Sequence, residues 1–369
     1  MSEIEKASRK PVKVQATQWL FPLAAFYAVL MLPLSVLGML GYLPVPAGLQ
    51  TPFGHAHEMI FGMAFLVVSG YLLGPMPKWQ LLAYIALWLL ARLSFIVWPF
   101  SLPAMLFAAA CAALLSYWVA PRFWRANKWR NQSVAPIIIL FSIATTLAGY
   151  DALVLHRLLA HGLLVLAALM FFIGGRIIAP TLASFWLRQK KRMANRVQPN
   201  LEGAGLISLA LALLLQVLDA IALLQALALG MAGVVVWLRL LRWQPWRYWR
   251  RLDILWLFFG YASLGTALLL LAAGVFSPLA GLIATHTLTV GAMGVLMLSV
   301  MARVTVVKRF KDANALRSSH VAAGLLVVGA LLRIFAPIFP AAYLPLLHSA
   351  MLCWLLGYAC LIWVFWQCR

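Results

Sequence analysis

The most regular feature of the chain is a series of long apolar stretches separated by short polar or charged segments. A bilayer core about 30 Å thick requires roughly 20 apolar residues in a transmembrane helix. The pattern predicts twelve such helices, of which the seventh and eighth are separated only by Asp219. They cover approximately residues 18–42, 58–76, 80–98, 102–120, 133–150, 155–180, 203–218, 220–241, 253–273, 279–301, 320–338 and 343–366.

Composition agrees with this pattern. The 369 residues are 65% hydrophobic and 10% charged, whereas an average soluble domain is about 45–50% apolar and about 25% charged. No soluble core buries so much apolar surface, which excludes an ordinary cytosolic enzyme. The sequence therefore predicts an all-α polytopic membrane protein, with an N-terminal tail at 1–17 and a transmembrane helical domain at 18–369.

The charge distribution predicts an orientation. The formal net charge of +21 comes from 29 Lys and Arg against 8 Asp and Glu. Most cations precede the first predicted helix or follow the fourth, sixth, eighth and tenth, and positive loops stay in the cytoplasm. Both termini are therefore predicted to be cytoplasmic. The charge indicates a topogenic signal with some attraction to anionic lipid, and not nucleic-acid binding.

Histidines are the most informative polar residues. Of the seven histidines, all but His320 fall in the outer, periplasmic halves of four predicted helices. A buried imidazole must bond through both nitrogens, and facing histidines on separate helices hold metals or haem in bundles. The alternative is that each imidazole bonds a backbone carbonyl or caps a helix. The candidate metal ligands are His55, His57, His156, His161, His286 and His348.

Spacing limits which of these histidines can share an ion. His55 and His57 point roughly 200° apart on a regular helix, so they converge only if the Pro52–Gly54 segment makes the backbone irregular. His156 and His161 lie about 140° apart, so one of them is expected to face the bundle, and His161 is favoured. The chain has no HExxH spacing, which argues against a hydrolytic zinc site.

Charged residues surround this predicted layer. Glu58 follows His57 directly and is suited to orienting an imidazole or relaying protons, and Asp151 lies at the same membrane surface. Guanidinium groups bind carboxylates bidentately, so outer-half arginines either neutralise haem propionates or pair with acidic residues and helix carbonyls. Both alternatives stay open for Arg92, Arg157 and Arg333.

Several segments resemble one known family. His55–Gly62 reads HAHEMIFG and resembles the HAHEMxFG signature of the NnrS family. Further along the chain, three segments are similar to that family's LWLxxR, IGGRxIP and HxLTVGAxG blocks, namely Leu87–Arg92, Ile173–Pro180 and His286–Gly294. The matches occur in order between residues 55 and 304 of a chain with twelve predicted helices.

The resemblance implies a haem- and copper-containing protein of the bacterial inner membrane, linked to nitric oxide metabolism and nitrosative stress. The chain has no CxxCH motif, so a b-type, non-covalent haem is expected. Glu58 and Asp151 are the predicted catalytic residues. The predicted cofactor-binding residues are His55, His57, His161, His286, His348, Arg92 and Arg333.

The leading functional hypothesis is reduction of nitric oxide to nitrous oxide, with electrons from quinol or a membrane partner. Nitric oxide is small and neutral, so it reaches a membrane-buried site through lipid, and a metal site holds two molecules close together. One alternative is a non-enzymatic nitric oxide binding or sensing protein. Another is a transporter of copper or a small solute, although the predicted helices lack paired Gly/Pro interruptions.

Overall fold

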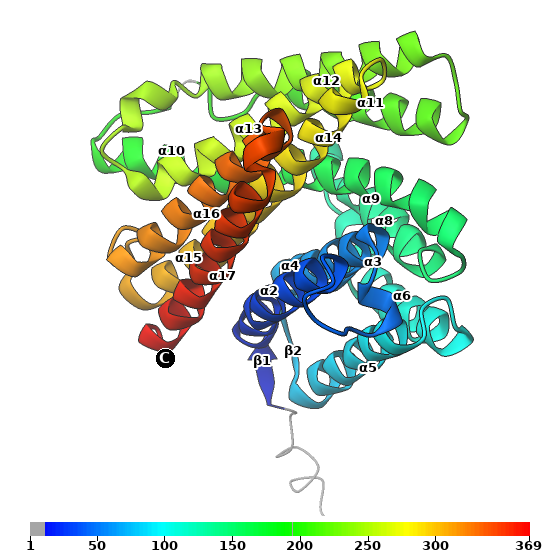
Figure 1. The fold of residues 1–369 in the computed structure, drawn as a ribbon. Coiled ribbons are helices and arrows are strands. Elements are labelled where there is room, and N and C mark those ends of the chain that lie inside the picture. The colour runs from blue at the N-terminus through cyan, green and yellow to red at the C-terminus, as the bar shows by residue number, and fades with distance from the viewer. Residues whose placement is uncertain (1–11, 194) are drawn as a thin grey trace, which may run out of the picture.

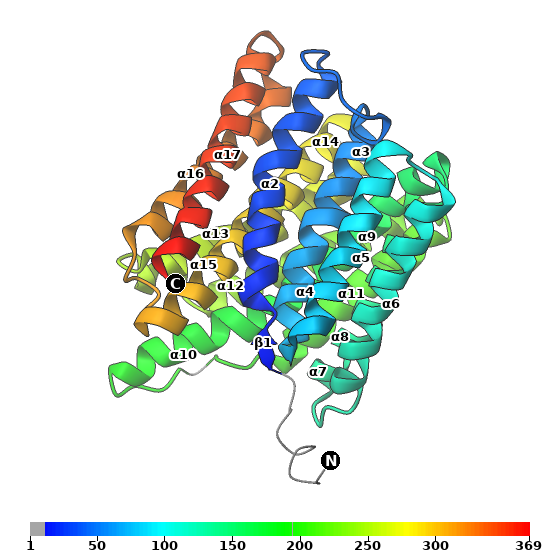
Figure 2. The same ribbon diagram turned by 90° about the horizontal axis from the view of Figure 1, so that it is seen from below.

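The computed structural model describes residues 12–193 and 195–369, so most of the predicted N-terminal tail lies outside the described residues. The described chain is an all-α bundle, as predicted, with eleven helices long and apolar enough to cross a membrane. Figures 1 and 2 show these helices packed side by side with short connections. We number each traverse of the bundle as a pass, in chain order.

The first six passes form one half of the chain. The second and sixth are composite, because a π-helical segment interrupts each α-helix. They comprise α2 (Thr17–Met39); α3 (Pro52–His57), η2 (Glu58–Ala64) and α4 (Phe65–Leu73); α5 (Lys78–Val97); α6 (Leu102–Trp124); α8 (Val134–Leu147), preceded by α7 (Trp129–Gln132); and α9 (Ala152–Ile173), η3 (Gly174–Ile178) and α10 (Ala179–Arg188).

The last six passes form the other half, and the tenth is again composite. They comprise α11 (Pro199–Val217); α12 (Ala222–Arg242); α13 (Leu252–Gly274); α14 (Pro278–His286), η5 (Thr287–Gly294) and α15 (Val295–Phe310); α16 (Arg317–Phe335); and α17 (Tyr343–Gln367). Short 3-10 turns lie in the connections, namely η1 (Ala47–Leu49), η4 (Pro245–Tyr248), η6 (Ala336–Ile338) and η7 (Pro340–Ala342). The predicted break at Asp219 is confirmed, since α11 and α12 are separate helices.

The fifth pass departs from the prediction of a full-length helix over 133–150. Its helix α8 has 14 residues, or about 21 Å at 1.5 Å per residue, which is short for a bilayer core. Ser133 separates it from α7, and Pro136 in its first turn favours a fresh start over continuation of α7. The α8 helix still traverses the bundle, because Gly149 beyond its end packs against Met105 at the start of α6.

Both ends of the described chain lie at the same end of the bundle (Figure 2). There β1 (Lys13–Gln15) pairs antiparallel with β2 (Pro75–Pro77), close to the second pass. We call this the proximal end, and the opposite end, which carries α3 and the connection between α16 and α17, the distal end. An even number of passes, with α8 included, accounts for this arrangement.

The three π-helical segments found among the described residues lie in the second, sixth and tenth passes. These passes are also the most buried, with 83%, 67% and 72% of their apolar stretches inside the protein, against 28–56% for the other eight long helices. They therefore form the core around which the remaining passes pack. π-Helical turns are rare and occur frequently at functional sites.

Candidate functional site

A buried polar network centres on Glu58, the first residue of η2. Its Oε1 accepts hydrogen bonds from His57 Nδ1 at 2.7 Å and from Arg92 Nη1 of α5 at 3.2 Å. Its Oε2 accepts a hydrogen bond from the Tyr27 hydroxyl of α2. Glu58 is 0% exposed and Arg92 is 3% exposed, so the pair lies away from solvent. We call these four residues the Glu58 network.

Of the two alternatives left open for Arg92, the structure therefore shows pairing with a carboxylate. A buried carboxylate without a partner is very costly, and Arg92 supplies the compensating charge across two helices. Tyr27 packs edge-on against Trp88 with ring centroids 4.9 Å apart, which fixes the hydroxyl relative to Glu58. The network is thus held by three passes, namely α2, the second pass and α5.

His57 has one nitrogen satisfied and one free. Its ring stacks on Phe95, with centroids 3.5 Å apart, and its other nitrogen, Nε2, is buried with no hydrogen-bond partner. Because Nδ1 donates to the Glu58 carboxylate, Nε2 carries the lone pair. A carboxylate bonded to Nδ1 is the usual arrangement that orients a metal-binding imidazole, although aromatic rings are the neighbours described around His57 here.

His55 takes a different partner from His57. Its Nδ1 lies 2.7 Å from Ser35 Oγ on α2. Ser35 Oγ also lies 2.8 Å from the carbonyl oxygen of Met31, to which its hydroxyl donates. Ser35 therefore accepts the hydrogen bond from His55 Nδ1–H, and His55 Nε2 keeps its lone pair.

His286 shows the same arrangement on the tenth pass, immediately before η5. Its Nδ1 donates to the carbonyl oxygen of Leu282 at 3.0 Å, which leaves the lone pair on Nε2. His286 lies within electrostatic range of His55. The second and tenth passes thus each carry an imidazole whose tautomer is fixed by an oxygen acceptor, and the two are near enough to interact electrostatically.

Arg333 of α16 completes this group. It lies within electrostatic range of both His55 and His286. Its guanidinium carbon lies 5.9 Å from the Tyr343 ring, and its Nη1 is buried without a hydrogen-bond partner. A buried guanidinium nitrogen that lacks a partner indicates a place for an anionic group. We call His55, His286 and Arg333 the distal site.

The other predicted ligands lie elsewhere. His156 is exposed, with its ring 5.1 Å from that of Phe53. His161 approaches the backbone of Gln216 at the end of α11. Of the two histidines of α9, His161 is half-buried and His156 is exposed, while Gly162 packs on the second pass, where its Cβ would lie 3.0 Å from Phe61. His348 packs beside Tyr42 with centroids 6.0 Å apart.

Asp151 and Arg157 also have local roles in the structure. The exposed Asp151 caps α9, because its Oδ1 accepts a hydrogen bond from the backbone nitrogen of Leu153 at 2.7 Å. Arg157 forms an exposed pair with Asp219 at 3.4 Å. Among the described residues, no group of three or more His, Cys, Asp or Glu is placed to hold a metal ion. The metal-binding roles of the six histidines therefore stay predictions.

Sequence reasoning missed Tyr27 and Ser35, which hold Glu58 and His55. Both are buried polar residues on the otherwise apolar α2, eight positions apart and so on roughly the same helix face. That spacing was an available signal. The π segments had no comparable signal, because their backbone hydrogen bonds depend on packing between passes.

Comparison with known protein families gives a match over nearly the whole chain. The family described as "NnrS protein" matches residues 14–368. No curated protein matches the chain. The matched range includes the Glu58 network, the distal site and all three π segments. The chain therefore belongs to the NnrS family, which links it to a nitric oxide-related function in the membrane.

Proposed function

We propose that the protein binds a b-type haem at the distal site and uses it to bind and reduce nitric oxide. One observation carries the proposal. His55 and His286 each bond an oxygen through Nδ1 and keep Nε2 for a ligand, beside a guanidinium nitrogen of Arg333 that has no partner. The supporting contacts come from three different passes.

The residues present fit this group chemically. Imidazole is a common axial ligand of haem iron, and Nδ1 bonded to an oxygen acceptor fixes the tautomer that ligates through Nε2. Arg333 supplies the bidentate donors that suit a propionate carboxylate. The chain has no CxxCH motif for covalent attachment. When bound, haem supplies a redox-active iron centre that binds nitric oxide and passes electrons to it.

Copper, which the family resemblance implied, has no comparable donor set among the described residues. Imidazole nitrogens suit copper, but His57 Nε2 stands alone among aromatic rings and no three-donor group surrounds it. No residue is therefore proposed as a copper ligand.

Reduction of two nitric oxide molecules to nitrous oxide and water consumes two electrons and two protons. In the proposal the Glu58 network supplies the proton-holding group. Glu58 is the only carboxylate in the described part of the second pass, and two of its hydrogen-bond donors, Tyr27 and His57, are themselves titratable. Asp151 lies outside this network, so we place it at the surface as a helix cap. Electrons come from quinol or a membrane partner.

The proposed orientation follows from the cations. Most of the described arginines and lysines gather at the proximal end, so we propose that this end faces the cytoplasm of a bacterial inner membrane. The distal site then lies in the periplasmic half. Nitric oxide is neutral and dissolves in lipid, so it reaches this site without a polar channel.

The test is an optical spectrum of the purified full-length protein, recorded oxidised, reduced with dithionite, and reduced with nitric oxide added anaerobically. We expect haem bands that shift when nitric oxide is added, followed by nitrous oxide formation when a reductant is present. Bands that do not shift would contradict nitric oxide binding and would indicate an electron-transfer haem with both imidazoles as ligands.

A second candidate function is nitric oxide binding without turnover. It is favoured by the full pairing of Glu58, because a saturated network also serves a purely structural role. Glu58→Gln separates the two functions. If the protein is a reductase, this variant keeps the nitric oxide-induced spectral shift while nitrous oxide formation falls at least tenfold. If it only binds, wild type and variant both show the shift and neither forms nitrous oxide above background.

A further inference from the structure

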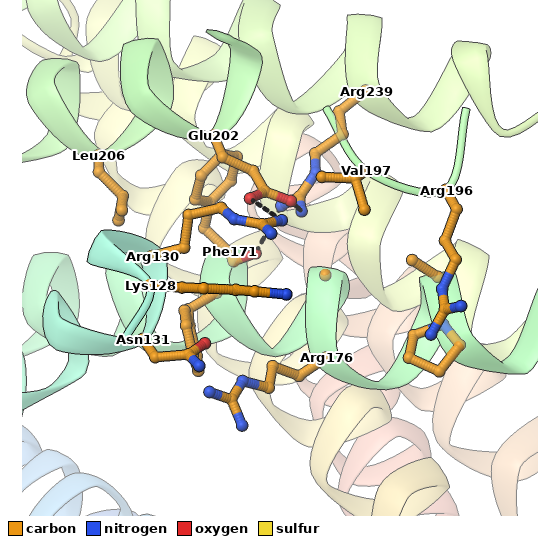
Figure 3. Close-up of a pocket in the computed structure, with 14 residues that line it drawn as sticks. Lys128, Arg130, Asn131, Phe171, Arg176, Arg196, Val197, Glu202, Leu206 and Arg239 are labelled. Atoms are coloured by element: carbon orange, nitrogen blue, oxygen red, sulfur yellow. Dashed lines mark hydrogen bonds and ion pairs between the residues drawn. The ribbon is translucent and has the colours of Figure 1, made fainter. Parts of the chain in front are cut away.

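A pocket of about 400 Å³ opens at the proximal end of the bundle, and its lining includes none of the three residues of the distal site. Its wall comes from α7 and the residue before it, the whole junction of α9, η3 and α10, the segment before α11, and the helices α11 and α12 (Figure 3). Five cationic side chains and a single carboxylate line it, namely Lys128, Arg130, Arg176, Arg196, Arg239 and Glu202. We call it the cationic pocket.

Part of this lining is a rigid frame. Glu202 Oε1 lies 2.5 Å from Arg239 Nη2, and its Oε2 lies 3.0 Å from Arg130 Nη1. Arg239 is 1% exposed and also donates from Nη1 to the carbonyl oxygen of Phe171 at 2.9 Å. Its guanidinium carbon lies 4.9 Å from the Phe171 ring and 5.0 Å from the Trp243 ring. We call Glu202, Arg130 and Arg239 the Glu202 frame. In it, the only carboxylate of the lining forms ion pairs with two arginines.

The remaining cations have no acidic partner. Among residues 12–193 and 195–369, no salt bridge involves Lys128, Arg176 or Arg196. Figure 3 shows Lys128 extending into the pocket between Arg130 and Arg176, with Arg196 on the other side. The lining as a whole carries an excess of four positive charges. A topogenic signal requires cations near the membrane, but not their convergence on one cavity.

We propose that the cationic pocket binds an anion that carries two phosphoryl groups. Guanidinium and ammonium groups form strong charge-assisted hydrogen bonds with phosphate oxygens, and several positive charges favour a multiply charged ligand. The cavity volume falls in the range of about 300–1,000 Å³ that is usual for small-molecule sites. The ligand comes either from a soluble diphosphate compound or from a lipid headgroup with two phosphates, and this chemistry is common to both.

The pocket also adjoins the π segment of the sixth pass. A Cβ on Gly175 of η3 would lie 2.4 Å from Arg239 Nη2, so only glycine lets the guanidinium approach the backbone this closely. Arg176, the next residue, contributes one of the unmatched cations, held beside Phe172 at 4.9 Å. An anion in the pocket would therefore contact a π segment in one of the three core passes.

The first test is calorimetric titration of the purified full-length protein with inorganic pyrophosphate. We compare wild type with Lys128→Gln and Arg176→Gln, and use Arg125→Gln as the matched control, because Arg125 is an exposed cation in the same connection that does not line the pocket. We expect each pocket variant to weaken binding at least tenfold and the control to match wild type. Unchanged thermal unfolding of the variants shows that they fold.

The second test uses native mass spectrometry of the same proteins with cardiolipin, which carries two phosphates, against phosphatidylcholine. Retention of cardiolipin that depends on Lys128 and Arg176, without pyrophosphate binding, supports the proposal with a lipid as the source. Pyrophosphate binding with the same dependence supports a soluble source. Binding of neither probe, or an equal loss in Arg125→Gln, overturns the proposal.

Discussion

The Glu58 network and the Glu202 frame are built alike but differ in their surroundings. Each pairs a carboxylate with arginine from a neighbouring helix, and Glu58 lies in a π segment while Glu202 lies beside one. Glu58 is 0% exposed and its partners balance its charge, whereas Glu202 is 12% exposed and lies in a pocket with four excess positive charges. The same pairing thus occurs once in a dry, balanced environment and once in an open, cationic one.

This difference indicates what each region is suited to bind. A buried and electrically balanced region excludes ions, because an ion would lose its hydration without gaining a counter-charge. Such a region suits neutral molecules, whereas the separate distal site has an unpaired guanidinium nitrogen on Arg333 that suits a carboxylate. The cationic pocket offers unmatched charge and access from water, so it suits a soluble anion or a headgroup.

The largest expected effect is on stability. Arg92→Leu leaves the Glu58 carboxylate buried without its counter-charge, and removal of one partner of a buried ion pair typically costs about 3–5 kcal/mol. We expect a large fall in the thermal unfolding midpoint of the purified protein. Arg157→Gln is the control, because its pair with Asp219 is exposed and is expected to contribute at most about 1 kcal/mol. Equal effects of the two variants would show that another group compensates the buried charge of Glu58.

The next effect concerns ligand orientation at the distal site. Ser35→Ala removes the acceptor that holds His55 Nδ1, and loss of such a supporting hydrogen bond typically weakens metal binding by about 10–100-fold. We expect the variant to lose haem faster than wild type when apomyoglobin is added as an acceptor. Ser116→Ala, which removes a serine that bonds Ser142 instead, is the control. A loss rate equal to that of the control would remove His55 from the proposed ligands.

A smaller effect is expected when a methyl group is added beside the Glu202 frame. Gly175→Ala places a Cβ 2.4 Å from Arg239 Nη2, so the guanidinium must shift from Glu202. Pyrophosphate binding should weaken several-fold while the haem spectrum stays as in wild type. Gly203→Ala, whose Cβ would meet Trp129 only at 3.6 Å, should change neither. A changed haem spectrum in Gly175→Ala would show that the two regions are coupled.

The smallest effect concerns ionic strength, which is expected to change pyrophosphate binding at the cationic pocket but not haem binding at the distal site. The Debye length falls from about 10 Å at 0.1 M to about 3 Å at 1 M ionic strength, so exposed charges are screened far more than buried ones. We expect pyrophosphate binding to weaken as sodium chloride rises, with haem content unchanged over the same range. Binding that ignores salt would indicate that the pocket recognises its ligand through groups other than its cations.

The sequence predicted the all-α membrane fold well, because the length of an apolar stretch is a direct consequence of bilayer thickness. Eleven of the predicted helices have counterparts among the long helices, and even the closely spaced pair around Asp219 is separate. The fifth predicted helix, over 133–150, was too long mainly at its C-terminal end, because α8 ends at Leu147 and hydropathy alone does not register the turn at residues 148–150.

The candidate site was predicted only in part. Glu58, His55 and His286 were identified by residue type, and pairing of Arg92 with Glu58 was one of two open alternatives. The directions of the imidazoles could not be predicted from the sequence, because a π turn changes which residues of a helix face its neighbours. Each of the three core passes contains such a turn. The cationic pocket was not predicted for another reason. Its cations are spread over residues 128–239 and were interpreted as topogenic charges.

The most direct measurement is the haem content per chain of purified wild type, His286→Ala and His156→Ala, expressed in a host that supplies haem. Both histidines belong to the predicted outer layer, but only His286 belongs to the distal site, while His156 is exposed. We predict haem in wild type and in His156→Ala, and its loss from His286→Ala. Absence of haem from wild type, or equal haem in all three proteins, would contradict a haem held at the distal site.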